Sequence, residues 1–256
     1  MSIGTADPES PRPTPLTSKK NVFERIAGVL FAPVDTFEDI VRKPDVLAPM
    51  LLLLAIGYVV TFVIMPIMDW DSIISAQTEQ MHKQNPNMTN ADIERATGMI
   101  KTFGKAMGYI GPMFGVIGWL VIAGVLFLAF RMFGGDGTYK QALSVTVYSW
   151  VPLTISSILL GIVAFSQHAF DPTKAATIVK SNPAFLVEMK EHPVLFSLLS
   201  TIDLFTIATI VFLIIGFSVM SRFSRVKSAM TILTLWFAAV AVKVGFAALT
   251  AARMKG

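Results

Sequence analysis

Five long stretches that are almost free of charged residues constrain this chain most strongly. They cover residues 46–68, 106–130, 142–166, 194–221 and 229–252. A helix needs about 20 apolar residues to cross the hydrocarbon core of a bilayer, because each residue adds roughly 1.5 Å against a thickness of ~30 Å. All five stretches reach that length. The sequence therefore predicts an all-α membrane protein that folds as a five-span transmembrane helix bundle.

Two other fold classes also contain long apolar segments. Buried helices of a soluble protein keep a polar face, and these stretches have none of any width. Strands of a membrane β-barrel alternate apolar and polar residues, whereas these runs are continuous. Composition agrees, because 54% of the residues are hydrophobic and 15% are charged, against about 25% charged in soluble domains. An ordinary water-soluble enzyme is therefore excluded.

Composition also limits the chemistry that we expect. The chain has no cysteine and three histidines, which excludes thiolate ligands and a cysteine nucleophile and argues against a histidine-rich metal centre. A net charge of +4 is too small and too dispersed to favour nucleic acid as a partner. We find no Asp, His, Ser and Glu residues that converge at one depth of the predicted spans. We therefore expect a protein that is not an enzyme, without catalytic residues, cofactor or metal.

The first 45 residues divide into two parts. Residues 1–20 are polar and rich in proline, without the apolar segment of a signal peptide, and we expect a disordered tail. Residues 21–45 show apolar residues at helical spacing on both sides of a break at Ala32-Pro33. This pattern predicts two amphipathic cytoplasmic helices, and the first turns Glu24 and Arg25 away from its apolar face.

The two amphipathic helices allow two interpretations. They lie at the cytoplasmic membrane surface or pack under the bundle. Alternatively, they form a docking surface for a membrane or peripheral protein partner. The apolar residues that would carry this docking are Phe23, Ile26, Leu30 and Phe37.

Positive charges predict the orientation, because lysine and arginine are enriched in short cytoplasmic loops. The short loops after the second and fourth stretches carry Arg131, Lys140, Arg222, Arg225 and Lys227. We therefore expect the N-terminus in the cytoplasm and the C-terminus outside. Residues 69–105 and 169–192 then form outer loops, and each shows two helical patterns separated by an Asn-Pro pair.

The second stretch contains a stripe of glycines on one side of the predicted helix. These are Gly108, Gly111, Gly115 and Gly118. Small residues let two helix backbones approach closely inside lipid. The stripe predicts close helix packing within one chain or, alternatively, a contact surface between two copies in a homo-oligomer.

Asp203 and Lys243 are the ionisable residues placed inside the apolar stretches. Each costs about 3 kcal/mol at the centre of a span, so each needs a partner or a hydrated cavity. Counting residues from the outer ends of their spans places both at a similar depth. We therefore predict an intramembrane Asp203–Lys243 ion pair. The alternative is that Asp203 bonds to a Tyr or Ser of the third span while Lys243 extends outward.

Several short passages carry a family resemblance. They are residues 31–40, 133–142, 148–152, 200–205, 216–218 and 228–229. These passages resemble the Yip-domain family of integral membrane proteins, in its bacterial branch. The resemblance implies five spans, a cytoplasmic N-terminus and a place in the bacterial cytoplasmic (inner) membrane. Eukaryotic members are named for interacting with Rab-type small GTPases, a role that does not transfer to a cell without Rab proteins.

One of these passages is rich in glycine. The resemblance implies a structural role, rather than a catalytic one, for Gly134, Gly135 and Gly137. It implies the same for Pro152, which follows further along the chain. Glycines between charged flanks favour a tight turn at the cytoplasmic surface.

Together these observations favour a non-enzymatic integral membrane protein that organises a membrane or acts as an adaptor. Its partners would be the lipid bilayer and a protein of unknown identity. The alternative is a carrier for a small solute, ion or lipid that uses Asp203 and Lys243. An adaptor should tolerate Asp203→Asn and lose function when the apolar face of residues 22–42 is charged, whereas a carrier should behave in reverse.

Overall fold

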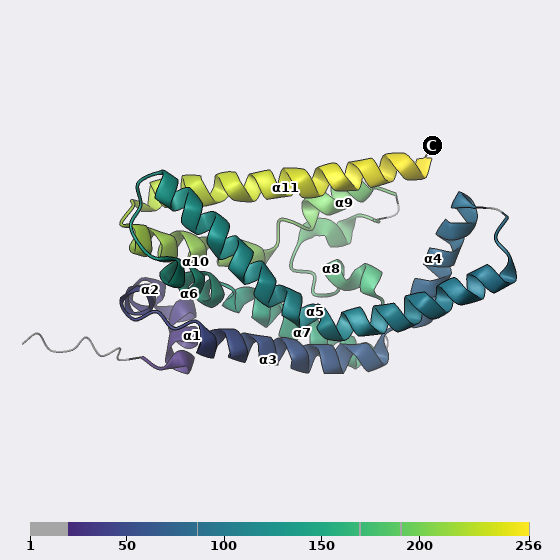
Figure 1. Cartoon of the computed structure of the whole chain (residues 1–256), viewed down its shortest axis with the longest axis horizontal. Helices are drawn as coiled ribbons and strands as arrows, with labels where there is room; N and C mark the ends of the chain where they lie inside the picture. Colours follow the sequence, from purple (N-terminus) through teal and green to yellow (C-terminus); the bar gives the residue numbers. More distant parts are fainter. Residues whose placement is uncertain (1–19, 86, 169, 190, 256) are drawn as a thin grey trace, which may run out of the picture.

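The computed structural model describes residues 20–85, 87–168, 170–189 and 191–255. The predicted disordered tail lies outside the described residues, apart from Lys20. Within the described ranges the regular elements are helical (Figure 1). In chain order they are α1 (Val22–Phe31), α2 (Pro33–Arg42), α3 (Leu47–Ile64), η1 (Met65–Ile67), α4 (Trp70–Gln84), α5 (Asn90–Met132), α6 (Tyr139–Ser149), α7 (Val151–Gln167), η2 (Pro172–Lys174), α8 (Ala175–Ile178), η3 (Pro183–Leu186), α9 (Pro193–Leu199), α10 (Leu204–Ser221) and α11 (Arg225–Lys255).

Five helical segments are long and apolar enough to cross a membrane. They cover Leu47–Ile67, Asn90–Met132, Tyr139–Gln167, Leu204–Ser221 and Arg225–Ala252. The predicted all-α bundle with five spans is therefore confirmed. Figure 1 shows α3 and α11 running broadly along one direction, while α5 crosses between them at an angle.

The second span belongs to the longest helix, because α5 continues into the first outer loop. α5 begins with a capping box, in which Thr89 and Asp92 each accept a hydrogen bond from the other's backbone. Pro112 lies inside the helix, where proline removes a backbone hydrogen bond and favours a kink. Figure 1 shows α5 changing direction in its middle. Before the bend, α5 packs against α4 at Gly104, where a Cβ atom would lie 2.7 Å from Cζ3 of Trp70.

The third span is divided between two helices, and the fourth span begins later than predicted. α6 and α7 meet at Trp150, and Pro152 lies in the first turn of α7, where its missing N–H is not needed. Pro152 therefore belongs to a helix junction, and its predicted place in the cytoplasmic turn is wrong. α9 ends at Leu199 and α10 begins at Leu204, so the fourth span does not start at residue 194 as predicted.

The largest core lies at the end of the bundle where α1, α2, α6 and α10 pack together, which we call the α2 end. Phe37 of α2 and Tyr148 of α6 are fully buried there. Gly216 makes the packing possible, because a Cβ atom on it would lie 2.4 Å from Cγ1 of Val145 and 2.9 Å from Cδ1 of Phe37. α2 is therefore a part of the bundle rather than a helix that rests on its surface.

The opposite end, which we call the α4 end, holds α4, α8 and α9 (Figure 1). The backbone N–H of Asp69 donates to Phe170 O at 2.9 Å, and the N–H of Phe170 donates to Ile67 O at 2.8 Å. Phe170 also packs in a small core with Ile64 and Ala164. These contacts hold the second outer loop against α3 and α7.

Candidate functional site

A buried arginine lies between the two N-terminal helices. α1 begins with a capping box formed by Asn21 and Glu24. It ends at Phe31 with Ala32 as its C-cap, and the following Pro33 starts α2, since proline is well suited to the first turn of a helix. The resulting helical hairpin brings Arg25 against α2, where it is only 2% exposed.

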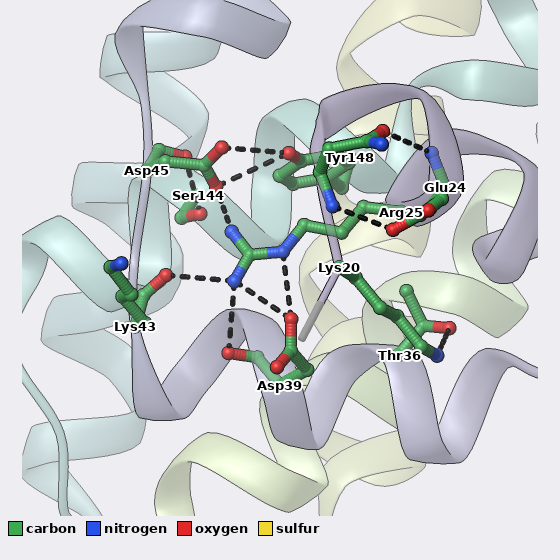
Figure 2. Close-up of polar contacts among 10 residues, drawn as sticks. Lys20, Glu24, Arg25, Thr36, Asp39, Lys43, Asp45, Ser144 and Tyr148 are labelled. Carbon is green, nitrogen blue, oxygen red and sulfur yellow. Dashed lines mark hydrogen bonds and ion pairs between the residues drawn. The ribbon is translucent and has the colours of Figure 1, made fainter. Parts of the chain in front are cut away.

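The Arg25 guanidinium contacts carboxylates from two segments of the chain (Figure 2). Its Nε donates to Asp39 Oδ2 at 2.9 Å, and its Nη2 lies 2.8 Å from the same oxygen. Its Nη1 pairs with the carboxylate of Asp45. Nη2 also donates to the backbone carbonyls of Asp39 at 3.2 Å and Lys43 at 3.1 Å. Arginine suits this arrangement because its planar fork presents five donors in fixed directions.

Asp45 extends this network to the third span. The Tyr148 hydroxyl of α6 donates to Asp45 Oδ2 at 3.0 Å, and the Ser144 hydroxyl donates to the Asp45 backbone carbonyl at 2.7 Å. Gln141 of α6 donates from Nε2 to the backbone carbonyl of Val41 at 2.8 Å. We call Arg25, Asp39, Asp45 and Tyr148 the arginine clamp. The clamp joins α1, α2, the α2–α3 connection and α6.

The electrostatics of the clamp keep the arginine charged. Burial by itself lowers the pKa of Arg25, but the hydrogen bond to Asp39 and the charge of Asp45 outweigh this effect, so the pKa lies above its ordinary value. The Tyr148 hydroxyl donates to a carboxylate that already binds Arg25. This arrangement suits holding helices in place, because the guanidinium and the two carboxylates have fixed partners on neighbouring segments.

Arg25 does not lie on a polar side of its helix, so the prediction that it points away from the apolar face is wrong. Arg25 shares its face with Val22 and Val29, at spacings of three and four residues. This spacing is the local signal that could have identified a buried arginine. No local signal connects Asp45 with Tyr148, because they are 103 positions apart in the chain.

The predicted docking surface is exposed only in part. Phe37 is fully buried against α10, so its predicted role is wrong. Ile26 and Leu30 are half-buried, and Ile26 packs against the largest core. Phe23 is 67% exposed, and Phe31, which the prediction did not include, is 86% exposed. The exposed apolar residues of α1, which we call the α1 face, are Phe23, Ala27 and Phe31.

Asp203 does not form the predicted ion pair with Lys243; the side chains of these two described residues have other partners. The chain breaks before α10, so Asp203 caps that helix. Its Oδ1 accepts from the backbone N–H groups of Phe205 at 2.9 Å and Thr206 at 3.0 Å. The Ser181 hydroxyl donates to its other carboxylate oxygen. This partner lies in the second outer loop, so the alternative prediction of a partner on the third span is wrong as well.

Lys243 reaches the residues that immediately precede Asp203. Its Nζ donates to the hydroxyls of Ser200 at 3.1 Å and Thr201 at 3.0 Å. α11 therefore brings Lys243 to the break between α9 and α10, close to Asp203 in the chain. Hydroxyl groups, rather than the carboxylate, receive its hydrogen bonds.

A cavity of about 310 Å³ adjoins Asp203 at the α4 end. Its polar lining comes from α7, from residues 181 and 182, from the α9–α10 connection and from the start of α10, with Ser156, Ser157, Ser181, Asn182, Ser200 and Thr206. A carboxylate among hydroxyl and amide groups can hold a small polar ligand. Within the part of the chain that the structure describes, no group of three or more His, Asp or Glu side chains is arranged to hold a metal ion.

The predicted glycine stripe packs closely within the chain at one of its four positions. A Cβ atom on Gly108 would lie 2.4 Å from Met65 Sδ, so this glycine lets η1 approach α5. For Gly111, Gly115 and Gly118, the described residues place no atom within 4 Å of such a Cβ. Packing within one chain is therefore the wrong explanation for these three glycines. The alternative, a contact with a second copy, stays a prediction.

The glycine-rich turn joins α5 to α6 at the α2 end. Gly134 and Gly137 have φ angles of +82° and +110°, which residues with a side chain rarely adopt. Gly135 lies so close to the preceding helix that a Cβ on it would be 2.9 Å from the Phe130 carbonyl oxygen. The three glycines therefore have a structural role in the turn.

Comparison with known proteins agrees with this architecture. The sequence pattern of the Yip1 domain matches residues 27–246. Membrane protein YknW of Bacillus subtilis (strain 168) is 28% identical over 204 residues, which cover 78% of each chain. Uncharacterized protein MJ0794 of Methanocaldococcus jannaschii is 31% identical over 61 residues, which cover 23% of this chain and 43% of that protein. No solved structure matches the chain.

Proposed function

This chain belongs to the Yip1 domain family of integral membrane proteins, and we propose that it is a non-enzymatic adaptor that presents a rigid surface to a protein partner. The surface is the α1 face at the α2 end. The basic short loops at the same end support a cytoplasmic position for it, in a bacterial inner membrane. The arginine clamp is the observation that carries the proposal.

The clamp supports an adaptor because it fixes a surface rather than adding much stability. A buried ion pair often stabilises a fold no better than apolar residues of the same volume, since both charges lose their hydration. What the guanidinium adds is direction, because its N–H groups point in fixed directions toward acceptors in defined places. α1 is therefore held at a fixed angle to the bundle by Arg25, and its exposed side chains keep fixed positions.

The α1 face supports a docking role because it leaves large apolar side chains uncovered. Phe23 and Phe31 lie two helical turns apart on the helix that the clamp holds. Exposed apolar patches mark contacts with proteins or membranes, and aromatic side chains are enriched in protein interfaces. A protein partner and the lipid surface therefore need to be distinguished by experiment.

Photo-crosslinking in native membranes tests the adaptor role. A photoreactive amino acid replaces Phe31, and a second version carries it at Phe246, which is exposed on the lipid-facing α11. We expect one discrete protein adduct from position 31 and lipid adducts from position 246. Phe23→Glu should abolish the adduct from position 31, and Phe103→Glu, in the exposed part of α5, should not. Lipid adducts alone from position 31 would overturn the adaptor proposal.

The cavity beside Asp203 favours a second candidate function, a carrier for a small polar solute. Transport would require the cavity to open toward the α2 end, where Phe37 and Phe217 are fully buried. Asp203→Asn distinguishes the two functions, because asparagine still caps a helix but carries no charge. An adaptor should keep its adduct at position 31 in this variant, whereas a carrier should lose its activity.

A further inference from the structure

A groove between α5 and α11 opens at the α2 end. It has a volume of about 490 Å³, and its apolar walls come from Met132 and Phe133 at the end of α5 and from Met230 and Leu235 of α11. Figure 1 shows the two helices close together at this end and apart at the other. Only 6% of the most apolar part of the α11 span is buried, so this side of the bundle faces lipid. In a bilayer the apolar walls of the groove therefore border the hydrocarbon chains of lipids, below the polar mouth.

A lysine is fixed at the mouth of the groove. Lys227 Nζ donates to the backbone carbonyl of Phe133 at 3.0 Å and lies 3.6 Å from the centre of the Phe223 ring. These contacts hold the ammonium group beside the groove instead of letting it move freely in solvent. An ammonium has three N–H donors, and the carbonyl of Phe133 occupies one of them. No acidic partner of Lys227 is found among the described residues.

The charges around the mouth have one dominant sign. The turns at this end carry the basic residues Arg131, Lys140, Arg222, Arg225 and Lys227. The acidic residue of the same turns, Asp136, lies 3.7 Å from Arg222 and so faces a different cation. The mouth therefore attracts an anion at the depth of the lipid headgroups.

We propose that the α5–α11 groove binds an anionic phospholipid. One acyl chain lies along Met132, Met230 and Leu235, and the phosphate contacts the Lys227 ammonium. A phospholipid with a net negative headgroup should bind at this mouth more tightly than a zwitterionic one, because the basic residues repel the cationic group of the zwitterionic headgroup. This inference is independent of the adaptor proposal, because it rests on a different pair of helices.

Native mass spectrometry of the purified full chain tests this site. The protein is incubated with equal amounts of phosphatidylglycerol and phosphatidylcholine that carry identical acyl chains, and the retained lipids are counted. We expect phosphatidylglycerol to be retained preferentially. Lys227→Gln should lower that preference about fivefold, the effect of one basic residue near a membrane surface. Lys105→Gln, which removes an exposed lysine from the other part of α5, should leave it unchanged.

A second variant tests the groove without changing any charge. Thr234 is exposed and lines the groove, so Thr234→Trp fills it from the side of α11. This variant should retain less lipid of either kind while unfolding at the temperature of the unmodified protein. Equal retention of the two lipids by the unmodified protein would overturn the proposal. Displacement of the lipid by millimolar glycerol phosphate would also overturn it, since the site would then take a headgroup alone. A dimer that retains no lipid and separates in Thr234→Trp would assign the groove to a second copy.

Discussion

At the scale of single residues, Arg25 decides whether the N-terminal helices belong to the bundle. It makes contacts with two carboxylates and two backbone carbonyls. One of these carboxylates, that of Asp45, also accepts a hydrogen bond from the Tyr148 hydroxyl of α6. The first two helices of a membrane protein with this hydropathy profile could equally lie on the bilayer surface. The clamp, together with the burial of Val29, Phe37 and Ile40 in the core, is the physical reason why they do not.

Removing the guanidinium should therefore be costly. Arg25→Ala leaves Asp39 buried without its cation, and breaking a buried ion pair in this way costs about 3–5 kcal/mol. We expect a lower unfolding temperature and faster proteolysis of residues 20–45 in lipid nanodiscs. Arg42→Ala changes the same charge at an exposed position of α2 and serves as the control. An equal effect of the two substitutions would contradict the clamp.

Arg25→Lys tests geometry rather than charge. Lysine keeps the positive charge but cannot reach Asp39, Asp45 and the backbone carbonyls at once, because its ammonium is a compact point. We expect this variant to recover only part of the stability lost in Arg25→Ala, as measured by the same unfolding curve. Full recovery would show that charge alone is sufficient.

At the scale of elements, glycines have opposite roles on two membrane helices. Gly216 on α10 lets α2 and α6 approach, whereas Gly111 on α5 faces open space among the described residues. Gly216→Ala should destabilise the protein by about 1–3 kcal/mol through overpacking against Val145 and Phe37. Gly111→Ala should leave stability unchanged or raise it slightly, because alanine is the better helix former. Thermal unfolding of both variants measures the contrast, which would be absent if α2 packed elsewhere.

The start of α4 should respond to pH. A hydrogen bond from the Ser72 hydroxyl, together with one from its backbone N–H, lowers the pKa of Asp69 below its ordinary value of 3.8. Since the folded-state pKa is the lower one, the cap contributes stability above pH 3.8 and loses it as the pH falls through the depressed value. Protection of the Ser72 amide in hydrogen exchange should follow this titration. In Asp69→Asn the protection should no longer depend on pH in this range.

At the scale of the whole molecule, the two ends of the bundle differ in packing. The α2 end contains the largest core and the arginine clamp, whereas the α4 end contains separate short helices and the cavity beside Asp203. α3, α5 and α11 expose most of their apolar surface, as expected for helices that face lipid. An adaptor that acts on one side of the membrane requires such a difference between ends.

The orientation can be measured directly because the chain contains no cysteine. A single cysteine at Lys140, in the first turn of α6, should be protected from a membrane-impermeant thiol reagent in intact cells. A cysteine at His82, exposed in α4, should react. This result would place the α2 end in the cytoplasm, as the positive-inside rule predicts. The reverse labelling pattern would move the α1 face outside and contradict a cytoplasmic partner.

Features that depend only on neighbouring residues could be predicted from the sequence. The five spans follow from local hydropathy, because a backbone in lipid must satisfy its hydrogen bonds within its own helix. The start of α5 at Thr89 and the break at Ala32-Pro33 follow from capping and proline chemistry within a few residues. These features were predictable because their physical causes are local.

Which faces of the helices meet, in contrast, became known only from the folded arrangement of the chain. Arg25 is buried because α2 and the α2–α3 connection bring two carboxylates to it, and Asp203 caps α10 because the fourth span breaks before it. Gly111 remains uncovered because its neighbours pack elsewhere. Inside a membrane, apolar residues face lipid and protein equally well, so hydropathy does not indicate which side of a helix is buried. That choice depends on shape and on polar contacts between residues as distant as Asp45 and Tyr148.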